Sequence, residues 1–185
     1  YSATSAFANN PMLISLDCLI RDGWLDLNDI KNYPKTNSNK VLFSNIKECK
    51  QTLLTKAAGN FRKFKTNDQK VKFKKYCKHN AYWLNDYALF CIIQNILQEQ
   101  EWLKWPKTFR AKEKDVLKKI NIENQNKIDE IKIIQYFYDS QWKELKRYAN
   151  NKGVRIIGDI PIYVSFNSVD VWINQDLFKL DENGN

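Results

Sequence analysis

Val154-Arg-Ile-Ile-Gly-Asp-Ile-Pro-Ile-Tyr-Val164, followed closely by Ser168-Val-Asp-Val-Trp172, carries the strongest structural signal in this chain. An apolar, β-branched run that ends on Gly158 and Asp159 is typical of a buried parallel strand with a carboxylate at its carboxyl end. Enzymes built on (β/α)8 barrels place their chemistry at that end of the strands. The pattern therefore predicts an α/β protein and makes Asp159 a candidate site residue.

The residues before this strand are predicted to be mainly helical. Asn10 and Pro11 form a favourable helix start, and Gly23 is suited to end that helix. A second helix is expected over residues 45–58, ending before Gly59. The segment 66–69, Thr-Asn-Asp-Gln, has the pattern of a capping box that opens a third helix.

Residues 82–99 carry apolar side chains on nearly every face, which predicts a buried helix. The segment 101–106 interrupts it and holds Trp102 and Trp105, which could stack on sugars or anchor a loop by hydrophobic packing. Further helices are expected after Thr108 and over residues 128–148, where apolar residues recur every three or four positions.

The chain has 185 residues and a net charge of +9, which raises the question of nucleic acid. The excess charge comes almost wholly from lysine, whereas recognition of bases and phosphates favours arginine. A composition biased toward lysine and asparagine explains the charge without a nucleic-acid partner. No apolar run approaches the roughly twenty residues of a membrane span, so no membrane partner is expected.

The four cysteines are scattered without a Cys-x-x-Cys pair, which favours reduced thiols in a cytoplasmic protein, although a disulfide remains an alternative. The single histidine, His79, has no neighbour at a metal-ligand spacing, so no metal is expected.

The positions of residues in the sequence suggest three candidate site residues: Asp159, Asp170 and Trp172. A carboxylate beside an aromatic face is a combination that carbohydrate sites use, for hydroxyl groups and for ring stacking respectively. The alternatives are structural, because Asp159 could cap a loop or a helix, and Asp170 and Trp172 could serve in capping and packing.

At these residues the chain resembles the 4-alpha-glucanotransferases of glycoside hydrolase family 77, called amylomaltases or disproportionating enzymes. The resemblance rests on the segments 158–164, 170–172 and 177–181, and it extends back through 141–149, Trp105-Pro106, 83–90 and 5–11. Because these motifs follow the family's order from end to end, the likeness covers the whole chain. One departure is Asn9, where the family usually has glycine.

The resemblance implies a (β/α)8 (TIM) barrel with a large, mainly helical insertion after the first strand. We expect the chain to be one partial catalytic domain, with the helical insertion over residues 1–125 and a helix plus the third-strand segment of the barrel over residues 126–185. As a piece lacking the first and the later strands, it is expected to be inactive by itself.

The implied reaction transfers α-1,4-glucan segments to the 4-hydroxyl of an acceptor glucan or glucose by a retaining mechanism, without a cofactor. Such chemistry uses two carboxyl groups about 5–5.5 Å apart. In the family the nucleophile lies in an Arg-x-Asp motif and a third carboxylate in a His-Asp pair, and this chain has neither arginine nor histidine after Asp159. No catalytic residue is therefore assigned here.

Four residues match family positions around the substrate. Tyr1 falls on the family's Ser-Pro-Tyr tyrosine beside the sugar next to the scissile bond, and Asp159 on the third-strand aspartate of the active-site floor. Asp170 and Trp172 match further family positions. The partners expected are maltooligosaccharides and other α-1,4-glucans.

Three rival interpretations remain open. One is a non-catalytic glucan-binding module that uses Trp102, Trp105 and Trp172. The others are a basic nucleic-acid binder and a small self-contained α/β protein that shares only the motif.

Overall fold

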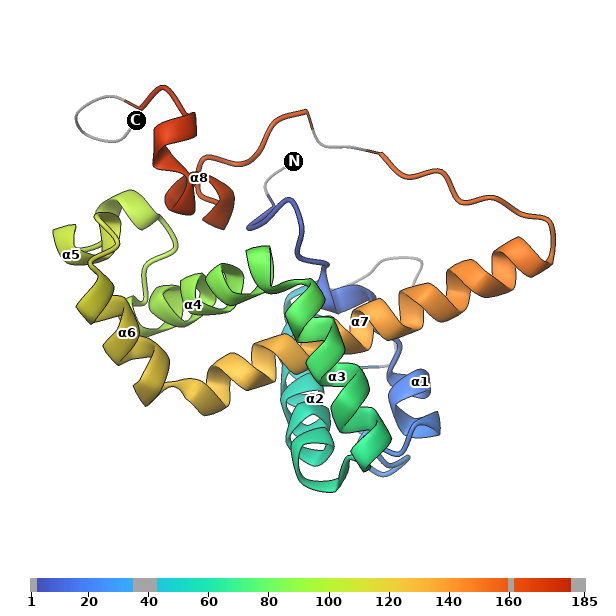
Figure 1. Ribbon diagram of the computed structural model, residues 1–185. Helices are drawn as coiled ribbons and strands as arrows, with labels where there is room; N and C mark the ends of the chain where they lie inside the picture. The colour runs from blue at the N-terminus through green and yellow to red at the C-terminus, as the bar shows by residue number, and fades with distance from the viewer. Residues whose placement is uncertain (1–2, 35–42, 160–161, 181–185) are drawn as a thin grey trace. The chain divides into compact units, whose positions relative to one another are not determined.

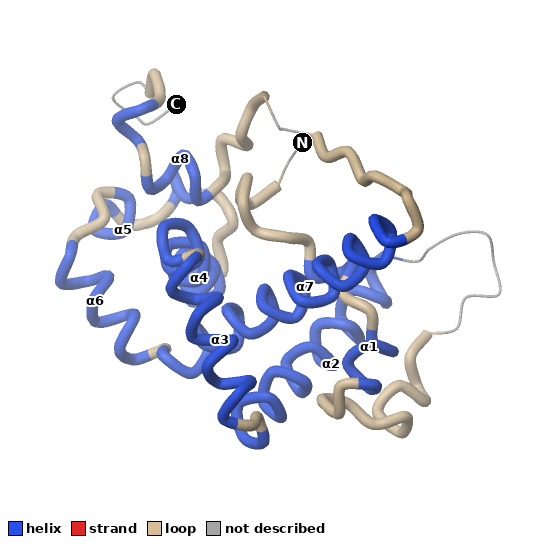
Figure 2. Tube along the Cα trace, turned by 45° about the vertical axis from the view of Figure 1, so that its right-hand side comes forward, coloured by secondary structure: helices blue, strands red, loops and turns tan. Residues whose placement is uncertain are grey.

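The computed structural model describes residues 3–34, 43–159 and 162–180, and every regular element in these ranges is a helix (Figure 2). The contacts divide the chain into two compact units. Unit 1 contains residues 1–9, 77–132 and 157–185, and unit 2 contains residues 10–76 and 133–156. The units interleave along the sequence, with boundaries inside α3 (Asn67–His79) and α7 (Gln125–Asn151). The division at residue 125 expected from the resemblance stays a prediction.

Unit 2 is built around a cluster of aromatic rings. Residues of α2 (Phe43–Phe64) reach the core at helical spacing, and Phe61 is fully buried. Its ring lies 4.9 Å from that of Trp24 and 5.6 Å from that of Phe137 on α7, measured between centroids. Edge-to-face pairs of this kind add to the stabilisation that burial of apolar surface provides.

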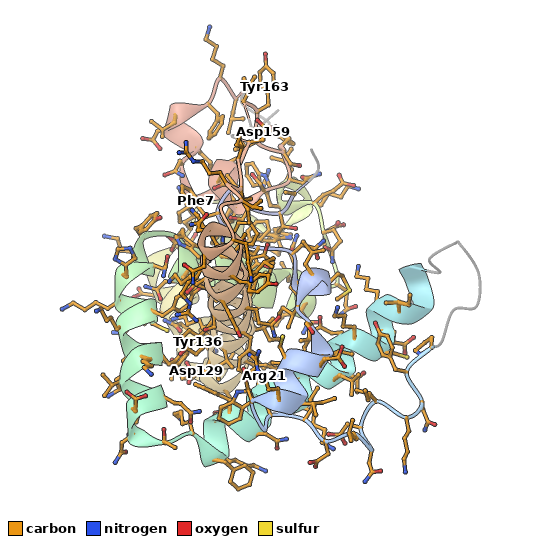
Figure 3. All side chains as sticks on the ribbon, turned by 90° about the vertical axis from the view of Figure 1, so that its right-hand side faces the viewer. Phe7, Arg21, Asp129, Tyr136, Asp159 and Tyr163 are labelled. Carbon is orange, nitrogen blue, oxygen red and sulfur yellow. The ribbon has the colours of Figure 1, made fainter. Side chains whose placement is uncertain are left out.

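The short helix α1 (Leu16–Arg21) is tied to α7 within unit 2. The side-chain amide of Gln141 accepts a hydrogen bond from the Ser15 N–H at 2.8 Å and donates one to the Ser15 carbonyl at 3.1 Å. Arg21, labelled in Figure 3, makes a two-fold contact with Glu144, both bonds at 2.8 Å. These contacts fix the orientation of α1 against the helix that leads toward residue 154.

The predicted start at Pro11 is confirmed, but the first helix is divided in two. A 3-10 turn, η1 (Pro11–Leu13), is capped by the Asn10 side chain, and α1 begins separately after a second cap at Ser15. Gly23 has a φ of +78°, as expected for a residue that ends a helix in the left-handed region.

The predicted end before Gly59 is wrong, because α2 continues to Phe64. A glycine inside a helix costs about 1 kcal/mol relative to alanine. Burial of Phe61 two residues later outweighs a cost of that size, since a fully buried aromatic side chain contributes more than this.

The capping box before α3 is confirmed. The Thr66 hydroxyl accepts from the Gln69 N–H at 3.3 Å, while the Gln69 side chain accepts from the Thr66 N–H at 2.8 Å. Both donors would otherwise lack a partner inside the helix.

Unit 1 contains the buried helix that the sequence predicts, α4 (Ala81–Leu97), with Leu84, Phe90 and Ile93 in the interior. The remaining elements of this unit surround it or follow it along the chain (Figure 1): η2 (Trp102–Lys104), α5 (Lys107–Arg110), α6 (Lys114–Glu123), the start of α7, α8 (Val169–Ile173) and η3 (Gln175–Leu177). Among them α4 contacts both α6 and α8.

The strand that the sequence predicts from Val154 to Asp159 is not formed in the structure. Instead, residues 154–159 are irregular, and Ile157 is 93% exposed. Ile162, shortly after this segment, is 88% exposed. A strand needs a neighbouring strand to satisfy its backbone groups. The described part of the chain supplies none, so the (β/α)8 barrel stays a prediction.

Candidate functional site

The motif Ser168-Val-Asp-Val-Trp172 forms the short helix α8. Ser168 is the N-cap, and its side chain accepts from the Val171 N–H. Val169, Val171 and Trp172 are buried, so three of the five residues of the motif anchor α8 in the core of unit 1. The helix therefore has a fixed position against α4 and the segment 102–110.

Trp172 is a core residue in this structure. Its side chain has 0% exposure, and its ring lies 5.5 Å from that of Phe90 and 5.7 Å from that of Trp105. The indole N–H donates to the Phe109 carbonyl at 3.0 Å, which satisfies the one polar group of the buried ring. A sugar cannot stack on a ring without exposed surface, so the structure does not support the expected role of Trp172 in substrate binding.

The other two tryptophans proposed for sugar stacking are buried as well. Trp102 is 1% and Trp105 is 2% exposed. Their indole N–H groups donate to the carbonyls of Phe166 and Glu99 at 2.9 and 3.1 Å. The segment 101–106 is a hydrophobic anchor. The alternative interpretation as a glucan-binding module required three exposed tryptophan rings, and all three rings are buried.

The Asp170 carboxylate belongs to a contact between distant parts of the sequence. Its Oδ2 accepts a hydrogen bond from the Ala6 N–H at 2.8 Å. A second hydrogen bond lies beside it: the Val169 N–H donates to the Thr4 carbonyl at 2.9 Å. The residues at the start of the described chain are thus brought to the start of α8, although the sequence pattern gave no sign of this pairing.

Asp159 lies exposed on the irregular segment that leads to α8, and Figure 3 shows it near Tyr163 at one end of the molecule in that view. No strand holds it at the edge of a sheet in the described residues, so its predicted place on a site floor stays a prediction. Tyr1, the fourth candidate, lies outside the described residues.

One carboxylate that the sequence analysis did not single out is Asp86 on α4. It is half-buried, and burial raises its pKa above the usual range, while the charge of Lys112 acts in the opposite direction. Lys112 itself donates to the Ile173 carbonyl at 2.7 Å. A charged residue inside an otherwise apolar helix was the signal that could have identified Asp86.

A groove of about 440 Å³ lies within unit 2 between α1 and α7. Its lining is mainly apolar and includes Leu13, Trp142 and Leu145. Of the polar side chains in its wall, Gln141 is engaged by the two hydrogen bonds with the Ser15 backbone, and the Ser15 hydroxyl accepts from the Cys18 N–H as the cap of α1. Few polar groups therefore remain to hold the hydroxyls of a glucan, and the groove is not our candidate for the substrate.

The remaining reactive side chains of the described residues form no metal site and no nucleophilic site. Among the described residues, no three His, Cys, Asp or Glu side chains are grouped so that they could hold a metal ion. The four cysteines are free, and burial raises the pKa of both Cys77 and Cys91 to about 11, which keeps these thiols protonated near neutral pH. No helix in the described ranges is long and apolar enough to cross a membrane.

Comparison with known proteins assigns the chain to a family. A family model described as 4-alpha-glucanotransferase matches residues 1–184. The chain therefore belongs to the 4-alpha-glucanotransferase family, as its motifs led us to expect.

Two curated relatives and one solved structure show how far the similarity extends. The 4-alpha-glucanotransferase of Aquifex aeolicus is 35% identical over 181 residues, which make up 98% of this chain and 35% of the relative. That of Clostridium butyricum is 36% identical over 184 residues, or 98% of this chain and 37% of the relative. The structure of an amylomaltase from Streptococcus agalactiae in complex with acarbose matches with a TM-score of 0.90 at 33% identity, covering 99% of this chain and 37% of that one.

The chain thus spans about a third of the length of the relatives that it matches. The fold of this chain is therefore similar to that part of the amylomaltase with which it aligns.

Proposed function

We propose that this chain serves in a 4-alpha-glucanotransferase that moves α-1,4-glucan segments to the 4-hydroxyl of an acceptor glucan or glucose. The observation that supports this most is the family match over residues 1–184, together with a similar fold in an amylomaltase solved with acarbose. Because the chain spans about a third of its relatives' length, it supplies only part of the residues that such a reaction needs.

The contribution we assign to the chain is binding rather than bond cleavage. A retaining transfer needs a nucleophilic carboxylate and an acid/base carboxyl group. The resemblance places the nucleophile in an Arg-x-Asp motif, and no arginine follows Asp159. The 185-residue polypeptide alone is therefore expected to leave maltotriose unchanged.

Tyr1 and Asp159 are the residues that we propose for glucan contact. The carboxylate of Asp159 is accessible to solvent and can accept hydrogen bonds from sugar hydroxyls. Tyr1 offers a ring for packing and a hydroxyl for hydrogen bonding. Trp172 is omitted because its side chain is fully buried. A glucan contact by Asp170 stays a prediction, and one of its carboxylate oxygens, Oδ2, accepts a hydrogen bond from the Ala6 N–H.

We also propose that residues 154–159 form a strand of a (β/α)8 barrel when neighbouring strands are present. The exposed β-branched side chain of Ile157 supports this, since such residues favour strands and gain from burial on a sheet. A cytoplasmic location is part of the proposal, supported by four free cysteines.

A chimeric enzyme tests the function directly. Residues 1–184 of this chain would replace the matched segment of the Aquifex aeolicus 4-alpha-glucanotransferase, and glucose release from maltotriose would be measured. We expect disproportionation to be retained. We expect Asp159→Ala to lower kcat/KM at least about tenfold. A tenfold decrease corresponds to a loss of roughly 1.4 kcal/mol of transition-state stabilisation.

Asp176→Ala is the matched control, because Asp176 is an exposed carboxylate of the same region and is expected to leave the rate unchanged. A folded chimera with no transfer activity would contradict the proposal. Equal rates for Asp159→Ala and the parent chimera would contradict a role of Asp159 in glucan binding but would not contradict the proposed activity.

A further inference from the structure

Most of the chain's net positive charge lies where α2 ends and α3 begins (Figure 1). Residues 62–76, which we call the basic corner, contain seven basic residues and one acidic residue, a net charge of +6. The whole chain has 30 basic and 21 acidic residues, so the other 170 residues hold 23 and 20, a net charge of +3. A lysine-rich composition alone would not concentrate the excess charge in one short segment.

Packing determines which side of α3 faces solvent. The Phe73 ring lies 5.5 Å from that of Tyr136 on α7, measured between centroids, so this side of α3 belongs to the aromatic core of unit 2. Positions three and four residues apart share a face of a helix. Val71, Lys74 and Lys75 therefore share the other side of α3, and all three are exposed.

Most of the lysines of the basic corner carry charge that no described carboxylate balances. Lys72 pairs with Asp68 at 2.7 Å, on the surface of α3. Four further lysines form no ion pair with any residue that the structure describes: Lys63, Lys70, Lys74 and Lys75. All four are exposed, so their ammonium groups are available to an anionic partner.

The basic corner also exposes apolar side chains among its lysines. Phe64, between Lys63 and Lys65 at the end of α2, is 72% exposed, and Val71 is 64% exposed. A surface that combines lysines with an exposed aromatic residue is typical of contacts with the headgroup region of a bilayer, where the cations meet anionic headgroups and the apolar groups reach the acyl boundary.

We propose that the basic corner is a docking surface for a bilayer that carries anionic lipids. Its unpaired lysines contact the headgroups, and Phe64 enters the region between headgroups and acyl chains. The proposal goes beyond glucan transfer, and a peripheral contact of this kind needs no helix that crosses the membrane. It agrees with the cytoplasmic location proposed above, because the cytoplasmic leaflet is the anionic one.

A nucleic acid fits the basic corner less well than a bilayer does. Six of its seven basic residues are lysines, whereas arginine is the residue that forks to phosphates and base edges. A single strand is bound in a positive groove that follows its backbone. The lysines of α3 instead lie on the outward side of a helix, which suits a broad surface.

Vesicle sedimentation with the 185-residue chain tests the proposal. We expect binding to vesicles of phosphatidylcholine and phosphatidylglycerol but not to vesicles of phosphatidylcholine alone, and weaker binding as salt is added. The double variant Lys74→Gln/Lys75→Gln should lower the partition coefficient at least about tenfold, since each lysine near an anionic surface contributes about fivefold.

The matched control is Lys118→Gln/Lys119→Gln, which removes the same charge from exposed positions of α6. We expect it to change the partition coefficient less than about twofold. Equal losses for the two pairs would show that net charge alone attracts the chain, and that result would overturn the docking surface.

Phe64→Ser tests the apolar part of the contact. We expect it to lower the partition coefficient at least about threefold, because the ring leaves water when the protein docks. Ile122→Ser, at a residue that is 67% exposed on α6, is the control and should have no effect. Thermal melts would show that each variant is folded, as expected for changes at exposed side chains.

Two further results would contradict the proposal. One is a folded chain that does not bind the anionic vesicles. The other is tighter binding to a single-stranded or duplex oligonucleotide than to these vesicles at the same salt concentration, which would assign the basic corner to a nucleic acid.

Discussion

Trp172 provides the largest stabilisation we expect from any single side chain of α8. Replacing it with alanine removes a fully buried ring from between Phe90 and Trp105 and leaves the Phe109 carbonyl without its donor. Trp→Ala changes at such positions cost about 3–5 kcal/mol. Urea denaturation followed by far-UV circular dichroism would measure this loss.

Trp142→Ala is the matched control for that variant, since the same ring is 38% exposed on α7. We expect a loss of free energy of unfolding well below that of Trp172→Ala. Equal losses for the two variants would show that the burial of Trp172 does not stabilise the protein as described.

Asp86 should make the stability depend on pH. Burial raises the pKa of its carboxyl group above the ordinary value of 3.8, so the folded protein holds this proton more tightly than the unfolded chain does. Stability from this group is therefore highest at low pH and falls as the pH rises from about 3.8 through the higher pKa of the folded state. Above that window the cost of the buried charge is constant.

Asp86→Asn removes the charge and keeps a polar group of similar size. We expect a higher Tm at pH 7 and a smaller fall in Tm between about pH 4 and pH 7 than in the parent. Thermal melts at several pH values would measure both. A lower Tm at pH 7 would mean that the interaction with Lys112 outweighs the cost of burial.

At the scale of the secondary-structure element, the contribution of the α3 cap to stability can be measured with a single substitution. Thr66→Ala removes the hydroxyl that accepts from the Gln69 N–H and should cost about 1 kcal/mol of unfolding free energy. The exposed Thr52 in the interior of α2 is the control, because alanine favours a helix interior and Thr52→Ala should be neutral or slightly stabilising. A loss of the same size at both positions would contradict a capping role.

The elements also show what the sequence could predict. The Thr66–Gln69 box and the left-handed Gly23 were predictable because each depends on contacts within a few residues. The end of α2 could not be predicted in this way, because the burial of Phe61 against Trp24 and Phe137 outweighs the low helix propensity of Gly59. The strand predicted over residues 154–159 depends on neighbouring strands for its hydrogen bonds, so a local pattern that favours a strand does not suffice to form it.

The candidate site was predictable only in part, and for the same reason. The motifs identified the family and drew attention to Asp159, Asp170 and Trp172, but they could not show which side of α8 is buried. The burial of Trp172 arises from packing against Phe90 and Trp105, and the bond from Ala6 to Asp170 joins residues 164 positions apart. Periodicity does not encode contacts between such distant segments.

At the scale of the whole molecule, the irregular segment after α7 should be an early target of proteases. Lys152 and Arg155 are exposed, and residues 154–159 have no regular structure. Such segments open with little free energy, so trypsin should cut there before it cuts within the described helices. Time-resolved digestion with mass spectrometry would measure the order, and a variant with both residues replaced by glutamine should delay this cut. An earlier cut inside α2 or α7, which both contain lysine and arginine residues, would contradict the expectation.

The burial of Trp172 gives such a cut a further consequence. Residues 157–180 contact the rest of unit 1 through this ring, through Val169 and Val171, and through the bonds to Thr4 and Ala6. Covalent continuity at Arg155 therefore adds little to the cohesion of unit 1. Two polypeptides separated at this position and produced together are expected to assemble and elute as one species, which would make residue 155 a natural point at which to split the chain.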